Sequence, residues 1–201
     1  MKKFRLKVYV RGAAVLQPSG EVRKLDHRLF TYRKIVRGKL MYTPIPPASL
    51  RGALRHAAYI AARVLGENYS EAYVSLFGSD PRLGEGRDTP VTRRGKIVVT
   101  LEEGLTLEEL RKLTEVRPRI SIDARYGTVR ERALMFYEAI SEVKDSNGLK
   151  PLVYSIDFIE EPTEEELRLF RAAIGLLRGW GIGGLSSLGF GLVERIECEE
   201  V

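Results

Sequence analysis

The sequence predicts an α+β fold of the ferredoxin-like, RRM-like type, in which helices cover one face of an antiparallel sheet. Patterns typical of strands and helices follow one another in the order strand, helix, strands, helix, strand, as in a split β-α-β arrangement. No linker between them is long enough to separate two domains, and 201 residues suffice for one sizeable core. We therefore expect a single domain over residues 1–201, from which inserted loops and a β-hairpin project.

The first strand is expected at residues 3–11, where apolar and basic side chains alternate. Alternate positions from Phe4 to Val10 are apolar and would face the core. The other face of the strand is basic and carries Tyr9. This alternation is typical of a half-buried strand.

A helix is expected to begin at Ser49, a natural N-cap that follows Pro46 and Pro47. Apolar residues then recur at helical spacing up to Val64, and Gly66 ends the helix. The exposed stripe of this helix forms a basic ridge, made of Arg51, Arg55, Tyr59 and Arg63.

The second half of the chain contains two capping boxes and a long hairpin. Thr106 and Glu109 would cap a short helix, and Thr163 and Glu166 would cap a longer one. Residues 119–140 have the pattern of a hairpin with a strongly basic tip, formed by Arg119, Arg125, Arg130 and Arg132. The remaining strands are expected at residues 97–101, 152–158 and 190–196.

Two stretches, residues 17–47 and 78–95, are expected to be long irregular loops because proline and glycine interrupt both. Loops of this length in a compact domain are usually functional or disordered. The first loop also contains Asp26 and His27, which bring carboxylate and imidazole chemistry to one place.

The composition points to a polyanionic partner in a reducing compartment. Lys and Arg exceed Asp and Glu, which gives a formal net charge of +6. Cys198 is the only cysteine, so an intrachain disulfide and a thiolate metal cluster are excluded. The sequence shows neither a secretory signal nor an apolar membrane span. We therefore expect a cytoplasmic protein, and the scarcity of Asn and Gln suggests a thermophilic source.

A glycine-rich stretch follows the last helix, at residues 179–191. Its glycines formally fit a dinucleotide-binding fingerprint, but that motif joins a strand to a helix, and here the order is reversed. A P-loop is excluded as well, because no Lys-Ser or Lys-Thr pair follows. The stretch forms either a tight connection with positive φ angles or a surface for an RNA backbone. We favour RNA contact, through Gly181, Gly183, Gly184, Ser186 and Ser187.

The helix start at Ser49 is a second candidate anion site. Free amides at residues 50–52 would point along the helix dipole toward an anion, while Arg51 adds charge and Gly52 permits close approach. The alternative is an ordinary capped helix with solvated arginines, since capping needs no ligand.

These elements together resemble the RAMP superfamily of CRISPR proteins, and most nearly the repeated backbone subunit of type III effector complexes. Four motifs occur in the family's order: the proline-serine-basic-glycine helix start at residues 46–52, Leu-Phe-Gly at 76–78, the Ile-Asp…Gly-Thr hairpin at 122–128 and the glycine-rich stretch. The resemblance extends over approximately residues 4–196.

The resemblance implies an RRM-like core, a groove for CRISPR RNA (crRNA) and a projecting β-hairpin. The hairpin at Ile122-Asp123 would wedge against the guide–target duplex, with Asp123 stabilising its turn. The implied partners are crRNA, target RNA, further copies of the chain and other effector subunits. The RNA contacts expected outside the glycine-rich stretch are those of Ser49, Arg51, Arg55, Arg119 and Arg125.

In the family, the loop after the first strand carries an aspartate needed for metal-dependent cleavage of target RNA, which makes Asp26 the candidate catalytic residue. Its carboxylate could hold a hydrated Mg²⁺ near the scissile phosphate. This loop departs from the family pattern, because no glycine pair precedes Asp26 and a basic, aromatic segment follows. A solvated Asp26 paired with Arg23 or Arg28 is the alternative.

His27 supports a different expectation, a metal-independent CRISPR RNA-processing endonuclease. In such enzymes a loop histidine acts as general acid or base with help from Tyr and Lys, and His27, Tyr32 and Lys24 could form that set. Those nucleases usually have two ferredoxin-like halves, whereas the patterns here complete only one. A third interpretation is a non-catalytic structural subunit.

Overall fold

A computed structural model describes residues 2–12, 16–18, 27–29, 31–66, 69–79, 93–129, 134–140, 142–145, 148–183 and 190–201. In chain order, the strands and helices are β1 (Lys3–Arg11), β2 (Leu16–Pro18), β3 (His27–Leu29), β4 (Tyr32–Val36), β5 (Lys39–Thr43), α1 (Pro47–Leu65), α2 (Tyr69–Phe77), β6 (Ile97–Glu103), α3 (Leu107–Leu113), β7 (Thr114–Arg119), β8 (Met135–Ile140), β9 (Lys144–Asp145), β10 (Gly148–Leu149), β11 (Leu152–Phe158), α4 (Glu164–Leu177) and β12 (Leu192–Glu200).

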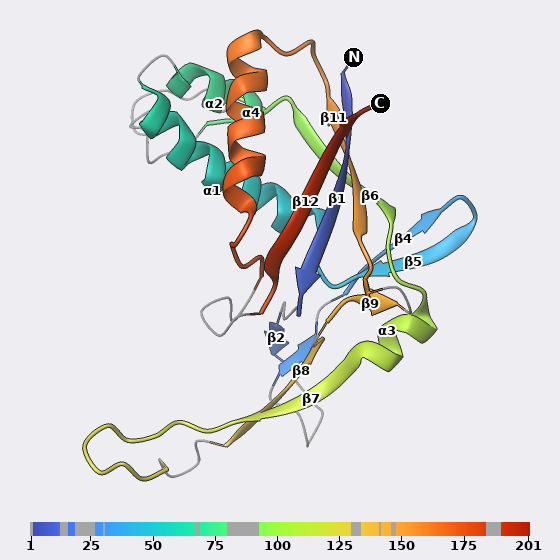
Figure 1. Ribbon diagram of the computed structural model, residues 1–201, viewed down its shortest axis with the longest axis vertical. Helices are drawn as coiled ribbons and strands as arrows, with labels where there is room; N and C mark the ends of the chain where they lie inside the picture. Colours follow the sequence, from blue (N-terminus) through green and yellow to red (C-terminus); the bar gives the residue numbers. More distant parts are fainter. Residues whose placement is uncertain are drawn as a thin grey trace.

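The main sheet has the strand order β12-β1-β11-β6, and every neighbouring pair is antiparallel. Its four strands and the helices α1 and α4 follow the chain order β-α-β-β-α-β, which is the ferredoxin-like arrangement. The predicted fold class is therefore confirmed. Figure 1 shows the helices α1, α2 and α4 together on one side of this sheet.

The core lies between the sheet and these helices. Phe4, Leu6 and Val8 alternate along β1 and are buried, as the period of a strand requires. The ring of Phe4 lies 5.7 Å from that of Phe158 on β11 and 5.3 Å from that of Phe170 on α4. These contacts join both central strands to the helical layer.

Helix α1 begins differently from the prediction. It starts at Pro47, with Pro46 as the N-cap residue and no side-chain cap, so the prediction of Ser49 as N-cap is wrong. Proline is well accommodated in the first turn of a helix, where its missing N–H is not needed. The helix does end at Gly66 as predicted. Both predicted capping boxes are confirmed, at Thr106 and at Thr163.

The described part of residues 17–47 is not the irregular loop that the sequence predicted, whereas most of the second predicted loop, at 78–95, lies outside the described residues. Residues 17–47 include a two-stranded ribbon, β4 and β5, whose strands pair from Tyr32↔Thr43 to Val36↔Lys39. Short strands β2 and β3 join β8 and β7 in a second sheet. Helix α2 was not predicted either, although the Leu-Phe-Gly motif marks its end.

Two ribbons project from the body of the molecule in Figure 1: the β7–β8 hairpin at the bottom and the β4–β5 hairpin at the right, beyond β6. A long hairpin is present as predicted, with β7 and β8 paired from Thr114↔Ile140 to Arg119↔Met135. Its first strand ends at Arg119, where the sequence predicted it to begin, and Arg130 and Arg132 of the predicted basic tip lie outside the described residues. Within the described ranges, no helix is both long and apolar enough to cross a membrane.

Candidate nucleic-acid interface

Two arginines of α1 hold the segment that follows α2. Arg51 donates from Nε to the carbonyl oxygen of Ile97 at 3.2 Å and from Nη2 to that of Phe77 at 3.1 Å. Arg55 donates from Nη2 to the carbonyl oxygen of Ser79 at 2.6 Å and from Nε to the Tyr73 hydroxyl at 3.2 Å. Both guanidinium groups therefore fasten α1 to neighbouring segments, whereas the sequence predicted that they would lie on an exposed ridge.

The surroundings of Arg51 also affect its charge. Burial lowers the pKa of its guanidinium from the ordinary value, and the nearby positive charge of Arg55 lowers it further. An arginine keeps its proton at neutral pH even so. An anion beside these two half-buried cations would be stabilised more strongly than at an exposed arginine, because water screens the charges less.

The backbone at the start of α1 is less available to an anion than the sequence suggested. The amide of Leu50 donates to the carbonyl oxygen of Pro46 at 3.1 Å and is already inside the helix. Proline has no N–H at positions 46 and 47, so the first-turn amides without an intrahelical acceptor are those of Ala48 and Ser49. A phosphate site here would use these two amides and the half-buried Ser49 hydroxyl.

The segment after α2 is bound closely to the segment that precedes β6. The amide of Ser79 donates to the carbonyl oxygen of Arg93 at 3.2 Å, and the amide of Lys96 donates to that of Ser75 at 3.0 Å. Gly95 packs so tightly that a Cβ atom would overlap the backbone of Leu76 and Phe77. The two segments thus form a rigid base beside Arg51 and Arg55.

A groove of about 440 Å³ runs from this base to the β4–β5 hairpin. One wall is the outer edge of β6, which is the last strand of the main sheet. The lining is largely apolar, includes an aromatic ring and two arginines, and is formed in part by Tyr32, Pro46, Pro47, Val99, Arg51 and Arg94. Such a lining suits a ligand that combines apolar rings with negative charge.

The glycine-rich connection is described up to Gly183 and again from Phe190. Its two ends pair with each other, since the amide of Ile182 donates to the carbonyl oxygen of Gly191 at 2.9 Å and the amide of Val193 donates to that of Trp180 at 2.8 Å. The ring of Trp180 lies 5.4 Å from that of His56 on α1. Gly181 and Gly183, two of the predicted RNA contacts, are exposed here.

The β7–β8 hairpin carries exposed cations and exposed apolar side chains. Arg119 and Arg125, both predicted to contact RNA, are exposed. Asp123 organises the tip, because its backbone carbonyl accepts from Gly127 N–H and its side chain accepts from Arg125 N–H, each at 2.8 Å. The turn-stabilising role expected for Asp123 is thus confirmed. More than half of the side chain of Ile122 is exposed.

A small aromatic cluster fixes the base of this hairpin to the glycine-rich connection. Phe190 makes an edge-on contact with Tyr137 of β8, with ring centroids 6.3 Å apart, and the guanidinium of Arg117 lies 5.0 Å from the centre of the Phe190 ring. Phe190 and Tyr137 are both buried. This cluster therefore holds together the β7–β8 hairpin and the glycine-rich connection, which were both predicted to contact RNA.

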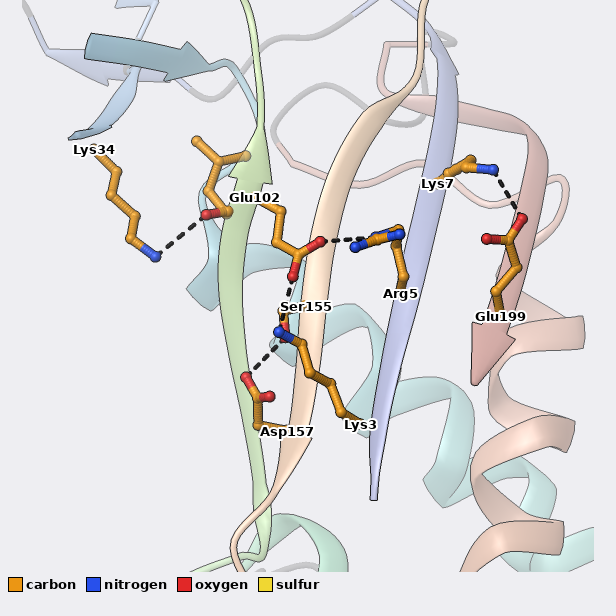
Figure 2. A network of polar contacts seen from close by, with 9 residues as sticks. Lys3, Arg5, Lys7, Lys34, Glu102, Ser155, Asp157 and Glu199 are labelled. Carbon is orange, nitrogen blue, oxygen red and sulfur yellow. Dashed lines mark hydrogen bonds and ion pairs between the residues drawn. The ribbon is translucent and has the colours of Figure 1, made fainter. Parts of the chain in front are cut away.

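The open face of the main sheet carries charges that neutralise each other (Figure 2). Glu102 of β6 accepts from Arg5 at 2.9 Å and pairs with Lys3 at 3.0 Å, while Lys7 pairs with Glu199 of β12 at 2.8 Å. Burial tends to raise the pKa of Glu102, but the bonds from Arg5 and Lys3 outweigh it and leave the pKa below its ordinary value. The predicted basic face of the first strand is therefore balanced by carboxylates of its neighbours.

Several predicted residues lie outside the described part of the chain: Lys24, Asp26, Gly184, Ser186 and Ser187. The backbone of His27 belongs to β3 and pairs with Pro18 and Tyr137. Among the described residues, no three His, Cys, Asp or Glu side chains lie close enough together to hold a metal ion.

Comparison with known proteins identifies a family and finds similar solved structures. A family model described as the RAMP superfamily matches residues 31–194. No curated protein matches the chain. A chain of a solved structure titled "Type IV-B CRISPR Complex" is similar over 100% of this chain and 90% of its own length, with a TM-score of 0.58 and 13% sequence identity. At this identity the likeness is one of fold.

Proposed function

The chain belongs to the RAMP superfamily, and from that premise we propose that it is a guide-RNA-binding backbone subunit of a CRISPR effector complex. The match to residues 31–194 is the observation that carries the proposal, because it covers α1, the β7–β8 hairpin and the whole glycine-rich connection. The likeness of the fold to a chain of a type IV-B complex supports a place in such an assembly. The motif order favours the type III backbone as the finer assignment.

The RNA is held mainly by its phosphates. The exposed glycines of the connection allow close approach of a backbone, and the Ala48 and Ser49 amides with Arg51 offer a second contact. Exposed Arg119 and Arg125 supply the third, on the β7–β8 hairpin. None of these groups is arranged to read base edges, so the sequence of the guide should matter little.

Binding to unrelated single-stranded RNAs across a range of salt concentrations tests this proposal. Affinity should fall steeply with salt and hardly differ between sequences. Arg119→Gln with Arg125→Gln should weaken every RNA alike and lower the salt slope by about 1.4, since each phosphate contact on a single strand contributes about 0.7. A strong preference for one sequence that does not respond to salt would contradict the proposal.

We further propose that Asp26 supports Mg²⁺-dependent cleavage of target RNA. A carboxylate of this kind can hold a hydrated metal ion close to the scissile phosphate. In the assembled complex, Asp26→Ala should reduce cleavage of guide-complementary RNA by about a hundredfold or more while guide binding stays unchanged. Asp26→Asn is the matched variant, since it keeps the size of the side chain and removes the charge.

Two other outcomes would replace this catalytic assignment. Cleavage that persists in a chelator and is lost in His27→Ala would indicate the RNA-processing endonuclease. No cleavage by the wild-type complex with any divalent metal would leave the structural subunit as the function.

A further inference from the structure

The β4–β5 hairpin concentrates positive charge, and no carboxylate in the described part of the chain balances it at Arg33, Arg37 or Lys39. Residues 32–43 contain four cations and no Asp or Glu. Lys34 donates to the carbonyl oxygen of Leu101 at 3.2 Å and so anchors the ribbon to the edge of β6. Arg33, Arg37 and Lys39 are exposed, and within the described ranges none of their side chains makes an ion pair or a hydrogen bond.

The cations of β1 are arranged in the opposite way. Lys3 and Arg5 each lie within 3.0 Å of a carboxylate oxygen of Glu102 on β6, and Lys7 lies within 3.0 Å of one of Glu199 on β12. The sheet therefore contributes little to the positive field of the molecule. The β4–β5 hairpin is a place where the excess of Lys and Arg remains available to an outside partner.

An apolar pair lies among these cations. Ile35 and Leu40 face each other across the ribbon, and their exposed fractions are 69% and 46%. Arg33 lies two residues before Ile35 and shares its face of the strand. Arg33 thus lies on the face of this apolar pair, Arg37 lies at the turn and Lys39 lies on the opposite face, and within the described part of the chain nothing covers the pair.

This combination fits a single strand of nucleic acid better than a duplex. A single strand presents both phosphates and open base faces, which can pack against side chains. A duplex hides its base faces in the stack and leaves an apolar pair without a partner. Salt-sensitive contacts to phosphates and salt-insensitive contacts to bases would then come from one ribbon.

The position of the hairpin separates it from the other proposed contacts. It lies at the β6 edge of the sheet, whereas the glycine-rich connection leads into β12 at the opposite edge. The β7–β8 hairpin projects in another direction (Figure 1). The groove lined by Tyr32, Arg51 and Arg94 extends from the base of the ribbon to the start of α1.

We propose that the β4–β5 hairpin is a further binding element for single-stranded nucleic acid, in which Arg33, Arg37 and Lys39 contact phosphates and Ile35 with Leu40 packs against bases. This inference rests on the proposed RNA-binding function and adds an element that the motifs of the sequence do not include.

The experiment measures binding of the full chain to a fluorescent single-stranded RNA over a range of salt concentrations. The triple variant Arg33→Gln, Arg37→Gln, Lys39→Gln should bind about 10- to 50-fold more weakly at 0.15 M salt, with a salt slope lower by about 2, because three phosphate contacts are lost. All three side chains are exposed, so the fold should tolerate the changes, and circular dichroism checks this.

The control removes the same charge elsewhere, through Lys2→Gln, Arg168→Gln and Arg171→Gln. These residues lie at the end of β1 and on the exposed side of α4, away from the hairpin. The control should bind within about threefold of the wild type. If the hairpin variant binds no more weakly than this control, the inference is wrong.

A second variant separates the apolar contact from the charge. Ile35→Ser with Leu40→Ser should reduce affinity for the single strand by about three- to tenfold and leave the salt slope unchanged, since apolar contacts release no counterions. A blunt RNA duplex should bind equally well to this variant and to the wild type. An equal loss on the duplex would overturn the single-strand assignment.

The two proposals can fail separately. If the Arg119→Gln, Arg125→Gln variant binds like the wild type while the β4–β5 triple variant does not, the hairpin inference stands and the β7–β8 contact fails. If the triple variant binds normally and the Arg119 and Arg125 changes weaken binding, the inference alone is overturned. A wild-type chain that binds no single strand would overturn both.

Discussion

At Gly191 the backbone leaves no room for a side chain. Its φ angle is 69°, and a Cβ atom would overlap the carbonyl of Ile182, which belongs to the strand-like pairing that closes the glycine-rich connection. Gly191→Ala should therefore lower the free energy of unfolding by about 2 kcal/mol or more. Urea denaturation followed by circular dichroism measures this.

Gly175 provides the matched control. It lies on the exposed side of α4, with no atom within 4 Å of where a Cβ would be. Gly175→Ala should raise the free energy of unfolding by about 0.5–1 kcal/mol, because alanine favours helix over glycine. If both changes had the same effect, the tight packing at Gly191 would not be what requires glycine there.

Glu102 should make the stability of the sheet depend on pH. Because its pKa is lower in the folded chain than its ordinary value, its ion pairs stabilise the fold above the unfolded pKa of about 4.3, and this contribution is lost as the pH falls through the folded pKa. Glu102→Gln should lower the free energy of unfolding by about 0.5–1 kcal/mol at pH 7 and have no effect near pH 2.5.

The exposed neighbour Glu103 is the control for this change. Glu103→Gln should alter stability by less than about 0.5 kcal/mol at either pH. A Glu102→Gln variant as stable as wild type at pH 7 would show that the network in Figure 2 does not contribute to folding.

Individual side chains were harder to predict than their elements. The helical spacing of Arg51 and Arg55 predicted an exposed ridge, but both are half-buried. Their acceptors at Phe77 and Ser79 lie at and just after the end of α2, a helix that was not predicted. Roles that depend on a partner distant in sequence do not follow from local periodicity. Asp123 was predictable because its partners lie within five residues.

Among the elements, Arg51 links α1 to α2 and to β6 through one planar group. Lysine keeps the charge but cannot reproduce two donors in a fixed plane. Arg51→Lys should therefore lower the free energy of unfolding by about 1–2 kcal/mol. Arg63→Lys, on the exposed last turn of the same helix, should change it by less than about 0.5 kcal/mol. Equal effects of the two substitutions in chemical denaturation would contradict the structural role of Arg51.

Elements with strong periodicity were predicted well and weakly patterned ones were missed. Helix α4 buries Leu167, Phe170 and Leu177, and these positions follow the predicted spacing. The β4–β5 hairpin was missed because its turn is Arg37-Gly38, with Arg37 at a φ of 49°, and lacks the Asn-Gly or Asp-Gly pair that usually indicates a tight hairpin. Its tip is also exposed, so burial imposes no alternation there.

At the scale of the whole molecule, the β4–β5 and β7–β8 hairpins extend in different directions from the core (Figure 1). In the main sheet, β1 and β11 are the central strands and are already paired on both sides. Such a shape suits head-to-tail contact between copies, which need not close into a ring. Light scattering with single-stranded RNAs of increasing length should show a mass that increases stepwise with RNA length. A constant mass of one protein per RNA would exclude the repeated assembly.

The net charge predicted a polyanionic partner, but the sequence could not show where the charge would act. Along β1 the cations are matched by carboxylates that come from positions near 102 and 199, so their neutralisation depends on the sheet topology. Within the described residues, the exposed cations at 33, 37 and 39 have no carboxylate partner of this kind. The distribution of charge is thus a property of the folded chain.

The contact between Trp180 and His56 gives this protein a built-in optical probe. Trp180 is the only tryptophan in the chain, and its half-buried ring joins the glycine-rich connection to α1, the two elements proposed to face the guide backbone. Indole emission depends on the polarity of its surroundings and on stacked rings. When the indole alone is excited, at wavelengths that tyrosine hardly absorbs, the fluorescence of the unlabelled protein therefore comes from one known position and can follow the arrival of RNA there in real time.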